Sequence, residues 1–170
     1  GVAALAAVFD TELAAYPVLT GTAANSLCLA AMTRPFSAVL CNSEAHILVD
    51  ECGAPELFTG GAKLLGLPEP AGKLTPEAIE RRIAGFVRGE HDPRPAVVSL
   101  TQATEVGTVY SPDEVRAIAD VAHAHGMRVH MDGARFANAL VGLGCTAAEL
   151  TWQAGVDALS FGGTKNGAMT

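Results

Sequence analysis

Short apolar runs alternate along this chain with longer stretches in which apolar residues recur every three or four positions. Six of the short runs are rich in β-branched or large apolar residues and are bounded by turn formers, a pattern that predicts buried strands. They span residues 17–21, 38–41, 46–50, 96–100, 128–132 and 157–161.

The longer stretches predict amphipathic helices. One covers residues 75–89, and two others begin with sequences typical of capping boxes, Ser111 with Glu114 and Thr146 with Glu149. Single buried strands separated by helices of this length are typical of βαβ crossovers. We therefore expect an α/β fold, with a mostly parallel sheet, helices on both faces and ligands at the carboxyl ends of the strands.

The composition fits a globular domain. Apolar residues make up 49% of the 170 residues and charged residues 17%, with a mean hydropathy of +0.29, values that exclude a disordered chain. The net charge is −7 with no basic cluster, so we expect neither a nucleic-acid nor a membrane partner. Proline and glycine interrupt the uncharged stretch 13–33, which argues against a transmembrane helix. Residues 65–73 are turn-rich and are expected to form a surface connection.

The four cysteines form no C-x-x-C pair and no closely spaced set. This spacing indicates neither a zinc site nor a disulfide framework. We expect reduced thiols and a cytoplasmic protein.

Candidate chemistry follows two of the predicted strands. Gly21 and Thr22 follow the first strand and open an alanine-rich helix, where free N–H groups and a hydroxyl could bind a phosphate. A plain turn with an N-cap would have the same sequence. Asp132 ends an apolar strand, and Arg135 follows three residues later. A buried aspartate needs a cation or hydrogen-bond donors, so it either holds a protonated ring nitrogen or caps the next helix.

Two further segments contain a lysine and a histidine. Lys165, one of three lysines in the chain, follows a predicted strand among glycines and a threonine. Neutral, apolar surroundings favour a nucleophilic amine that can form a Schiff base, although a surface loop would also accommodate it. His46, followed by Asp50 and Glu51, is either a core residue or a ring that stacks on a flat cofactor. Together these groups are the parts needed to bind pyridoxal 5′-phosphate.

Four strings in these segments, GTAANSL, EAHILVDECGAP, HMDGARFANA and DALSFGGTKNG, carry a resemblance. They are similar to the large domain of the low-specificity L-threonine aldolases, in the β-eliminating lyase group of fold-type-I pyridoxal phosphate enzymes. The resemblance covers essentially the whole chain. It implies an aspartate-aminotransferase-like large domain that is incomplete: residues 1–170 would be a partial cofactor-binding domain without an N-terminal segment and a C-terminal small domain.

The resemblance also implies roles for single residues. Lys165 would form the Schiff base with the cofactor, and residues 21–22 would bind its phosphate. Asp132 would pair with the ring nitrogen, Arg135 would approach the phenolic oxygen, and His46 would stack on the ring. The implied reaction cleaves L-threonine or a related β-hydroxy-α-amino acid to glycine and an aldehyde, after a base removes the β-hydroxyl proton.

The family pattern places a second histidine after the strand 96–100, where this chain has Glu105. His46 is therefore the main candidate for the base, with Glu51 and Glu105 as further candidates for the base or for a substrate contact. The departure leaves open whether the preferred β-substituent is small or as bulky as that of phenylserine.

Alternative interpretations stay open at this point. The chain could belong to another β-eliminating lyase or an aminotransferase of the same fold, or be an inactive piece of such an enzyme. A metal-dependent hydrolase would have to use His123, His125, His130 and Asp132. The first two lie on different faces of a predicted helix, so we expect no metal site. By resemblance we expect an amino acid substrate and a homotetramer.

Overall fold

A computed structural model describes residues 1–168. Five strands form one sheet in the order β2-β1-β3-β4-β5, and every neighbouring pair is parallel. In chain order they are β1 (Ser37–Asn42), β2 (Lys63–Leu67), β3 (Arg94–Thr101), β4 (Arg128–Gly133) and β5 (Ala158–Phe161). The predicted parallel α/β sheet is confirmed.

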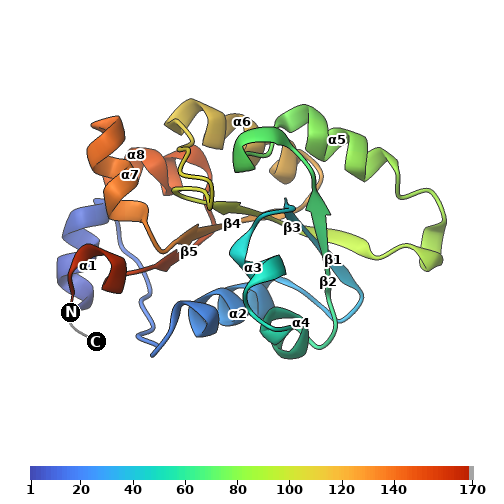
Figure 1. The fold of residues 1–170 in the computed structure, drawn as a ribbon, viewed down its shortest axis with the longest axis horizontal. Coiled ribbons are helices and arrows are strands. Elements are labelled where there is room, and N and C mark those ends of the chain that lie inside the picture. Colours follow the sequence, from blue (N-terminus) through green and yellow to red (C-terminus); the bar gives the residue numbers. More distant parts are fainter. Residues whose placement is uncertain (169–170) are drawn as a thin grey trace.

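Helices cover both faces of the sheet (Figure 1). On one face lie α2 (Gly21–Met32), α3 (His46–Val49) and α4 (Ala54–Phe58), and on the other α5 (Pro76–Ala84), α6 (Pro112–Ala124), α7 (Phe136–Leu143) and α8 (Ala147–Leu150). Helix α1 (Val2–Phe9) lies beside α8, where the Trp152 Nε1–H donates to the Phe9 carbonyl at 2.8 Å. Short 3-10 turns occur at Pro70–Gly72, Gly89–His91, Trp152–Ala154 and Thr164–Asn166.

The predicted helix starts form as their sequences suggest. Both capping boxes are present: Ser111 and Glu114 exchange bonds at the start of α6, and Thr146 and Glu149 do so at the start of α8. Such bonds satisfy backbone N–H groups that have no partner within the helix. They fix where each crossover helix begins after its preceding loop.

The two faces of the sheet differ in polarity. Side chains alternate along a strand, so Val129 and Met131 join the large apolar cluster beneath α5 and α6. His130 and Asp132 point to the opposite face, where α2 packs. The polar residues of the central strands therefore collect between the sheet and α2.

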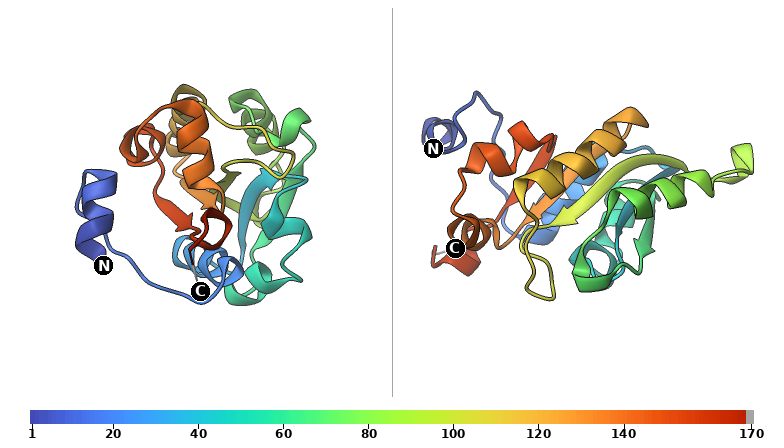
Figure 2. Two further views of the ribbon diagram at one scale, coloured as in Figure 1. Left: turned by 60° about the vertical axis from the view of Figure 1, so that its left-hand side comes forward. Right: turned by 90° about the horizontal axis from the view of Figure 1, so that it is seen from above.

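Two predicted strands are not strands. Residues 17–21 form no ladder, and the segment 11–20 instead leads in extended form from α1 to α2 (Figure 2), with Leu19 97% exposed. Residues 46–50 include helix α3. A strand beginning only four residues after β1 could pair with it only as a hairpin, whereas β1 and β2 are parallel and need a long crossover.

The strand that follows β1 in the chain is β2, at the edge of the sheet, and its last three residues overlap the stretch 65–73 expected to be a surface connection. Its residues are mostly half-exposed, which explains its weak apolar pattern. A Cβ on Gly66 would lie 2.7 Å from Leu48 Cδ2, so the glycine that suggested a turn instead lets α3 pack closely on this strand.

All four cysteines are free thiols, as expected. Within residues 1–168, no helix combines the length and apolar character that crossing a membrane requires.

Candidate active site

A cavity of about 210 Å³ opens at the carboxyl ends of the central strands, where α2 begins. Seven of the eight candidate residues from the sequence line it: Gly21, Thr22, His46, Glu51, Glu105, Asp132 and Lys165. Asn25, Ala134, Gly162 and Thr164 complete the lining. Residues separated by up to 144 positions thus meet at one edge of the sheet, because parallel strands bring their carboxyl ends together.

The start of α2 presents free backbone donors to this cavity. Thr20 is the N-cap: its Oγ1 accepts from the Ala23 N–H at 3.1 Å, and its carbonyl accepts from the Ala24 N–H at 3.1 Å. The N–H groups of Gly21 and Thr22 precede the first helical hydrogen bond and have no intrahelical acceptor. With the positive end of the helix dipole, they suit an anion.

Asp132 lies at the end of β4 and is 5% exposed. One of its oxygens, Oδ1, accepts from the Ala134 N–H at 3.0 Å, and Oδ2 accepts from Asn25 Nδ2 at 2.8 Å. Each carboxylate oxygen has a second lone pair. Asp132 can therefore hold a protonated nitrogen of a ligand while keeping both protein bonds.

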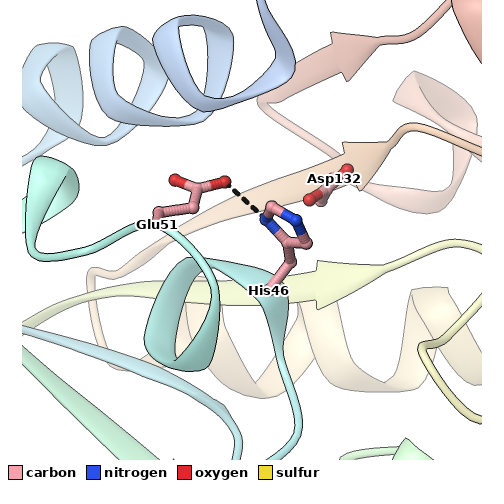
Figure 3. A group of neighbouring side chains, drawn as sticks. All are labelled: His46, Glu51 and Asp132. Atoms are coloured by element: carbon pink, nitrogen blue, oxygen red, sulfur yellow. Dashed lines mark hydrogen bonds and ion pairs between the residues drawn. The ribbon is translucent and has the colours of Figure 1, made fainter.

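The Glu51 carboxylate forms a hydrogen bond with the ring of His46 (Figure 3). His46 begins α3, and Glu51 follows that single turn, so their side chains meet with Nδ1 2.9 Å from Oε1. The Glu51 side chain is fully buried, whereas that of His46 is 33% exposed. An ionised carboxylate only accepts hydrogen bonds, so beside it Nδ1 carries a proton, and in the neutral form of the ring Nε2 keeps a free lone pair.

Asn25 is the site residue that the sequence did not reveal. It is 2% exposed, and its Nδ2 lies 2.8 Å from both Glu51 Oε1 and Asp132 Oδ2. The only signal was an amide at the position one turn before Leu29, on the buried face of α2. His46, Glu51 and Asp132 offer ligand-type atoms within 4.8 Å of one another, but the Asn25 amide already bridges the two carboxylates, so we interpret the group as a hydrogen-bond network.

Lys165 lies in the turn Thr164–Asn166 beyond β5 and is exposed at the cavity rim. The neutral, apolar burial suggested by its neighbours is not found. The turn is held close to the sheet by small residues: a Cβ on Gly162 would lie 2.8 Å from Ala134 Cα, and Asn166 Nδ2 donates to the Gly162 carbonyl at 3.1 Å.

Glu105 and Arg135 occupy different positions from the buried network. Glu105 lies on the loop after β3, at the rim of the cavity. Burial raises the pKa of its carboxyl, Asp132 and Asp50 raise it further, and His46 and Lys165 lower it. Arg135 is exposed at the start of α7 and does not line the cavity.

His130 lies below Asp132 on the same face of β4 and is fully buried. Its Nδ1 lies 2.9 Å from Ser99 Oγ on β3, and its Nε2 lies 3.0 Å from Ser160 Oγ on β5. Burial lowers the pKa of this ring to about 4, although Asp132 acts in the opposite direction. His130 is thus a neutral bridge across three strands.

The histidines of the metal-hydrolase alternative do not converge. His123 Nε2 lies 2.9 Å from Asp157 Oδ2, and His125 Nε2 lies 3.1 Å from Glu80 Oε2, both at the surface. His130 bonds to two serines instead. Three residues engaged in separate bonds do not form the ligand set that this alternative requires.

Comparison with known proteins identifies close relatives. The family model described as β-eliminating lyase matches residues 2–170. The chain is 54% identical over 160 residues to the low-specificity L-threonine aldolase of Pseudomonas aeruginosa and 52% identical over 160 residues to that of Pseudomonas sp.. Each alignment covers 94% of this chain and 46% of the relative. The chain thus spans about half the length of the curated relatives it matches.

The fold is also found among solved structures. The threonine aldolase of Leishmania major superposes with a TM-score of 0.80 at 32% identity, over 86% of this chain and 43% of that one.

Proposed function

Since the chain belongs to the β-eliminating lyase family, we propose that the full-length protein uses pyridoxal 5′-phosphate to cleave L-threonine and related β-hydroxy-α-amino acids into glycine and an aldehyde. The observation that carries this proposal is the cavity in which Lys165, Asp132 and the start of α2 meet. It occurs in a chain that is 54% identical to a low-specificity L-threonine aldolase.

The donors and acceptors around the cavity fit this cofactor. A Cβ built on Gly21 would meet no heavy atom of residues 1–168 within 4 Å, which leaves room for a phosphate beside the free N–H groups of α2. Asp132 offers a buried carboxylate with free lone pairs for a ring N–H. Lys165 offers an amine at the rim. The cofactor requires these three features: an anion site for its phosphate, a carboxylate beside its ring nitrogen and an amine for its aldehyde.

Each of these residues then has a defined task. Gly21 and Thr22 would bind the phosphate through backbone N–H groups and the Thr22 hydroxyl. Asp132 would keep the ring nitrogen protonated, because a negative charge beside a nitrogen base favours its protonated form. Lys165 would supply the amine that holds the aldehyde group of the cofactor. When bound, the cofactor would accept the electron pair released as the substrate Cα–Cβ bond breaks.

We assign the removal of the β-hydroxyl proton of the substrate to His46. Its Nδ1–H is held by Glu51, so the free lone pair of Nε2 can take a proton, and the ring lines the cavity. The Glu51 side chain is fully buried, so we assign it to orienting His46 and not to contacting substrate. Glu105 at the rim is left as the candidate for contacts with the β-substituent.

The closest competing functions use the same cofactor and differ in their products. Other β-eliminating lyases would release ammonia and a keto acid, which is 2-oxobutanoate when the substrate is L-threonine, and an aminotransferase would give a keto acid only with a second amino donor. We therefore propose to incubate the full-length protein with L-threonine and to identify the products by mass spectrometry. Equimolar glycine and acetaldehyde, lost in Lys165→Ala, support the aldolase; 2-oxobutanoate with ammonia, or a keto acid formed only with a second amino donor, would overturn it.

We further propose that residues 1–170 alone lack turnover, because they span about half the length of the relatives. Expressing this span by itself tests the point, and robust glycine release would contradict it.

A cytoplasmic homotetramer is also proposed. Free thiols at all four cysteines support a reducing compartment, and large exposed apolar side chains such as Tyr16 and Leu19 support an interface between subunits.

A further inference from the structure

We propose that Asn25 is a positioning residue. Its side-chain amide links Asp132, the carboxylate assigned to the ring nitrogen, to Glu51, the carboxylate that orients His46. The inference rests on the proposed function, because it assigns a task to Asp132 and His46 in the same site. It adds a residue on α2 that acts through both of them.

The orientation of the amide follows from its neighbours. Both atoms within 2.8 Å of the Asn25 amide group are carboxylate oxygens, Glu51 Oε1 and Asp132 Oδ2. Ionised carboxylates only accept hydrogen bonds, so the NH2 group must face them, and it has one hydrogen for each. The opposite orientation would set the amide oxygen against two negative oxygens.

The bridge addresses an electrostatic problem that the fold creates. Glu51 and Asp132 are 4% and 5% exposed, and neither has an ion pair with a lysine or an arginine within residues 1–168. Two negative charges buried this close repel each other, and their charged forms need hydrogen-bond donors. The Asn25 amide donates to both at once, and one of its bonds is shared with the atom that holds His46.

Several other titratable groups lie around this network. They lie on α3, on the loops after α3 and β3, on β4 and on the turn beyond β5: His46, Asp50, Glu105, His130 and Lys165. None of them is within hydrogen-bonding distance of Asn25, whose Oδ1 has no partner in the part of the chain that the structure describes. The two bonds to carboxylates are therefore what a substitution at this position removes.

Two substitutions separate positioning from packing. Asn25→Asp keeps the size of the side chain but replaces two donors with acceptors. Asn25→Ser leaves a single donor. The matched control is Ser26→Ala, because Ser26 is 1% exposed on the same turn of α2 and its hydroxyl has no hydrogen-bond partner among residues 1–168.

The test measures two quantities on the full-length protein, with folding checked by circular dichroism. The first is the dissociation constant for pyridoxal 5′-phosphate, obtained by equilibrium dialysis. The second is the pH profile of kcat/KM for L-threonine. For Asn25→Asp we expect cofactor binding at pH 7 to weaken at least about tenfold. The acid limb of the kcat/KM profile should move up by about one pH unit, because a third carboxylate adds negative charge that favours proton uptake in the site. Asn25→Ser should show a smaller change, and Ser26→Ala should stay within about twofold of the unmodified protein.

Each outcome is decisive. If a folded Asn25 variant keeps the affinity and pH profile of the unmodified protein, or if only its melting temperature falls, the inference is wrong while the proposed function stands. Loss of folding in both variants would show that the amide serves the fold, and would also overturn it. If the unmodified protein binds no pyridoxal 5′-phosphate, the proposed function itself fails and this inference fails with it.

Discussion

His130 makes the stability of this protein sensitive to acid. The ring is fully buried and bridges Ser99 and Ser160, and burial lowers its pKa from 6.5 to about 4. In the unfolded chain the same ring is solvated and titrates near its ordinary value. The folded and unfolded states therefore bind different numbers of protons between these two pH values.

The sign follows from which state takes up the proton first. Below pH 6.5 the unfolded chain binds a proton that the folded chain accepts only near pH 4, so acid favours unfolding. This stabilisation is complete above pH 6.5 and is lost as the pH falls towards 4. At 1.36 kcal/mol per pH unit, the difference between the two pKa values corresponds to about 3 kcal/mol.

The assay is urea unfolding of the cofactor-free, full-length protein at pH 7 and pH 4, for the unmodified protein and for His130→Gln. Glutamine is neutral at both pH values and can still bond to a serine hydroxyl. Titrating groups that do not interact with His130 contribute equally to both proteins, so we expect the unmodified protein to lose about 3 kcal/mol more than the variant. Equal losses in the two proteins would refute the assignment of a neutral, buried His130.

Three further substitutions test other parts of the structure. Gly162→Ala puts a Cβ 2.8 Å from the backbone of Ala134 and should lower the free energy of unfolding in urea by about 1–3 kcal/mol. Its control is Gly142→Ala, whose Cβ meets no described atom within 4 Å and which should not destabilise the protein. Equal effects of the two substitutions would contradict the close approach at Gly162. Ser111→Ala removes the N-cap bond of α6 and should cost about 1 kcal/mol in the same assay; an unchanged midpoint would count against the cap. Glu51→Gln should lower kcat for L-threonine by about tenfold or more, because it weakens the orientation of the general base His46; an unchanged kcat would remove Glu51 from the mechanism.

The sequence predicted the half of the fold in which strong strand patterns adjoin well-marked helix starts. Strands β3, β4 and β5 are apolar runs followed or preceded by capped helices, so their existence and parallel order could be inferred. Once the strands are parallel, Asp132 at the end of β4 and Lys165 beyond β5 must lie at one edge. Most of the cavity lining was predicted for that reason.

The remainder depends on tertiary contacts that a one-dimensional pattern does not contain. A short apolar run suits a strand or a buried helical turn equally well, and at His46–Val49 the parallel pairing of β1 with β2 decides for the helix. Edge strand β2 is half-exposed and therefore lacks a strong apolar signal. Asn25 could not be identified as a bridge before the positions of Glu51 and Asp132 were known, since 107 residues separate it from the latter.

The most direct test of the account is to locate the cofactor on the chain. Borohydride treatment of the purified full-length protein, followed by peptide mass mapping, fixes pyridoxal 5′-phosphate to the lysine that binds it. We predict a pyridoxyl phosphate group on the peptide that contains Lys165 and its loss in Lys165→Ala. A group on Lys63 or Lys73, or no modified peptide at all, would contradict the assignment of this cavity.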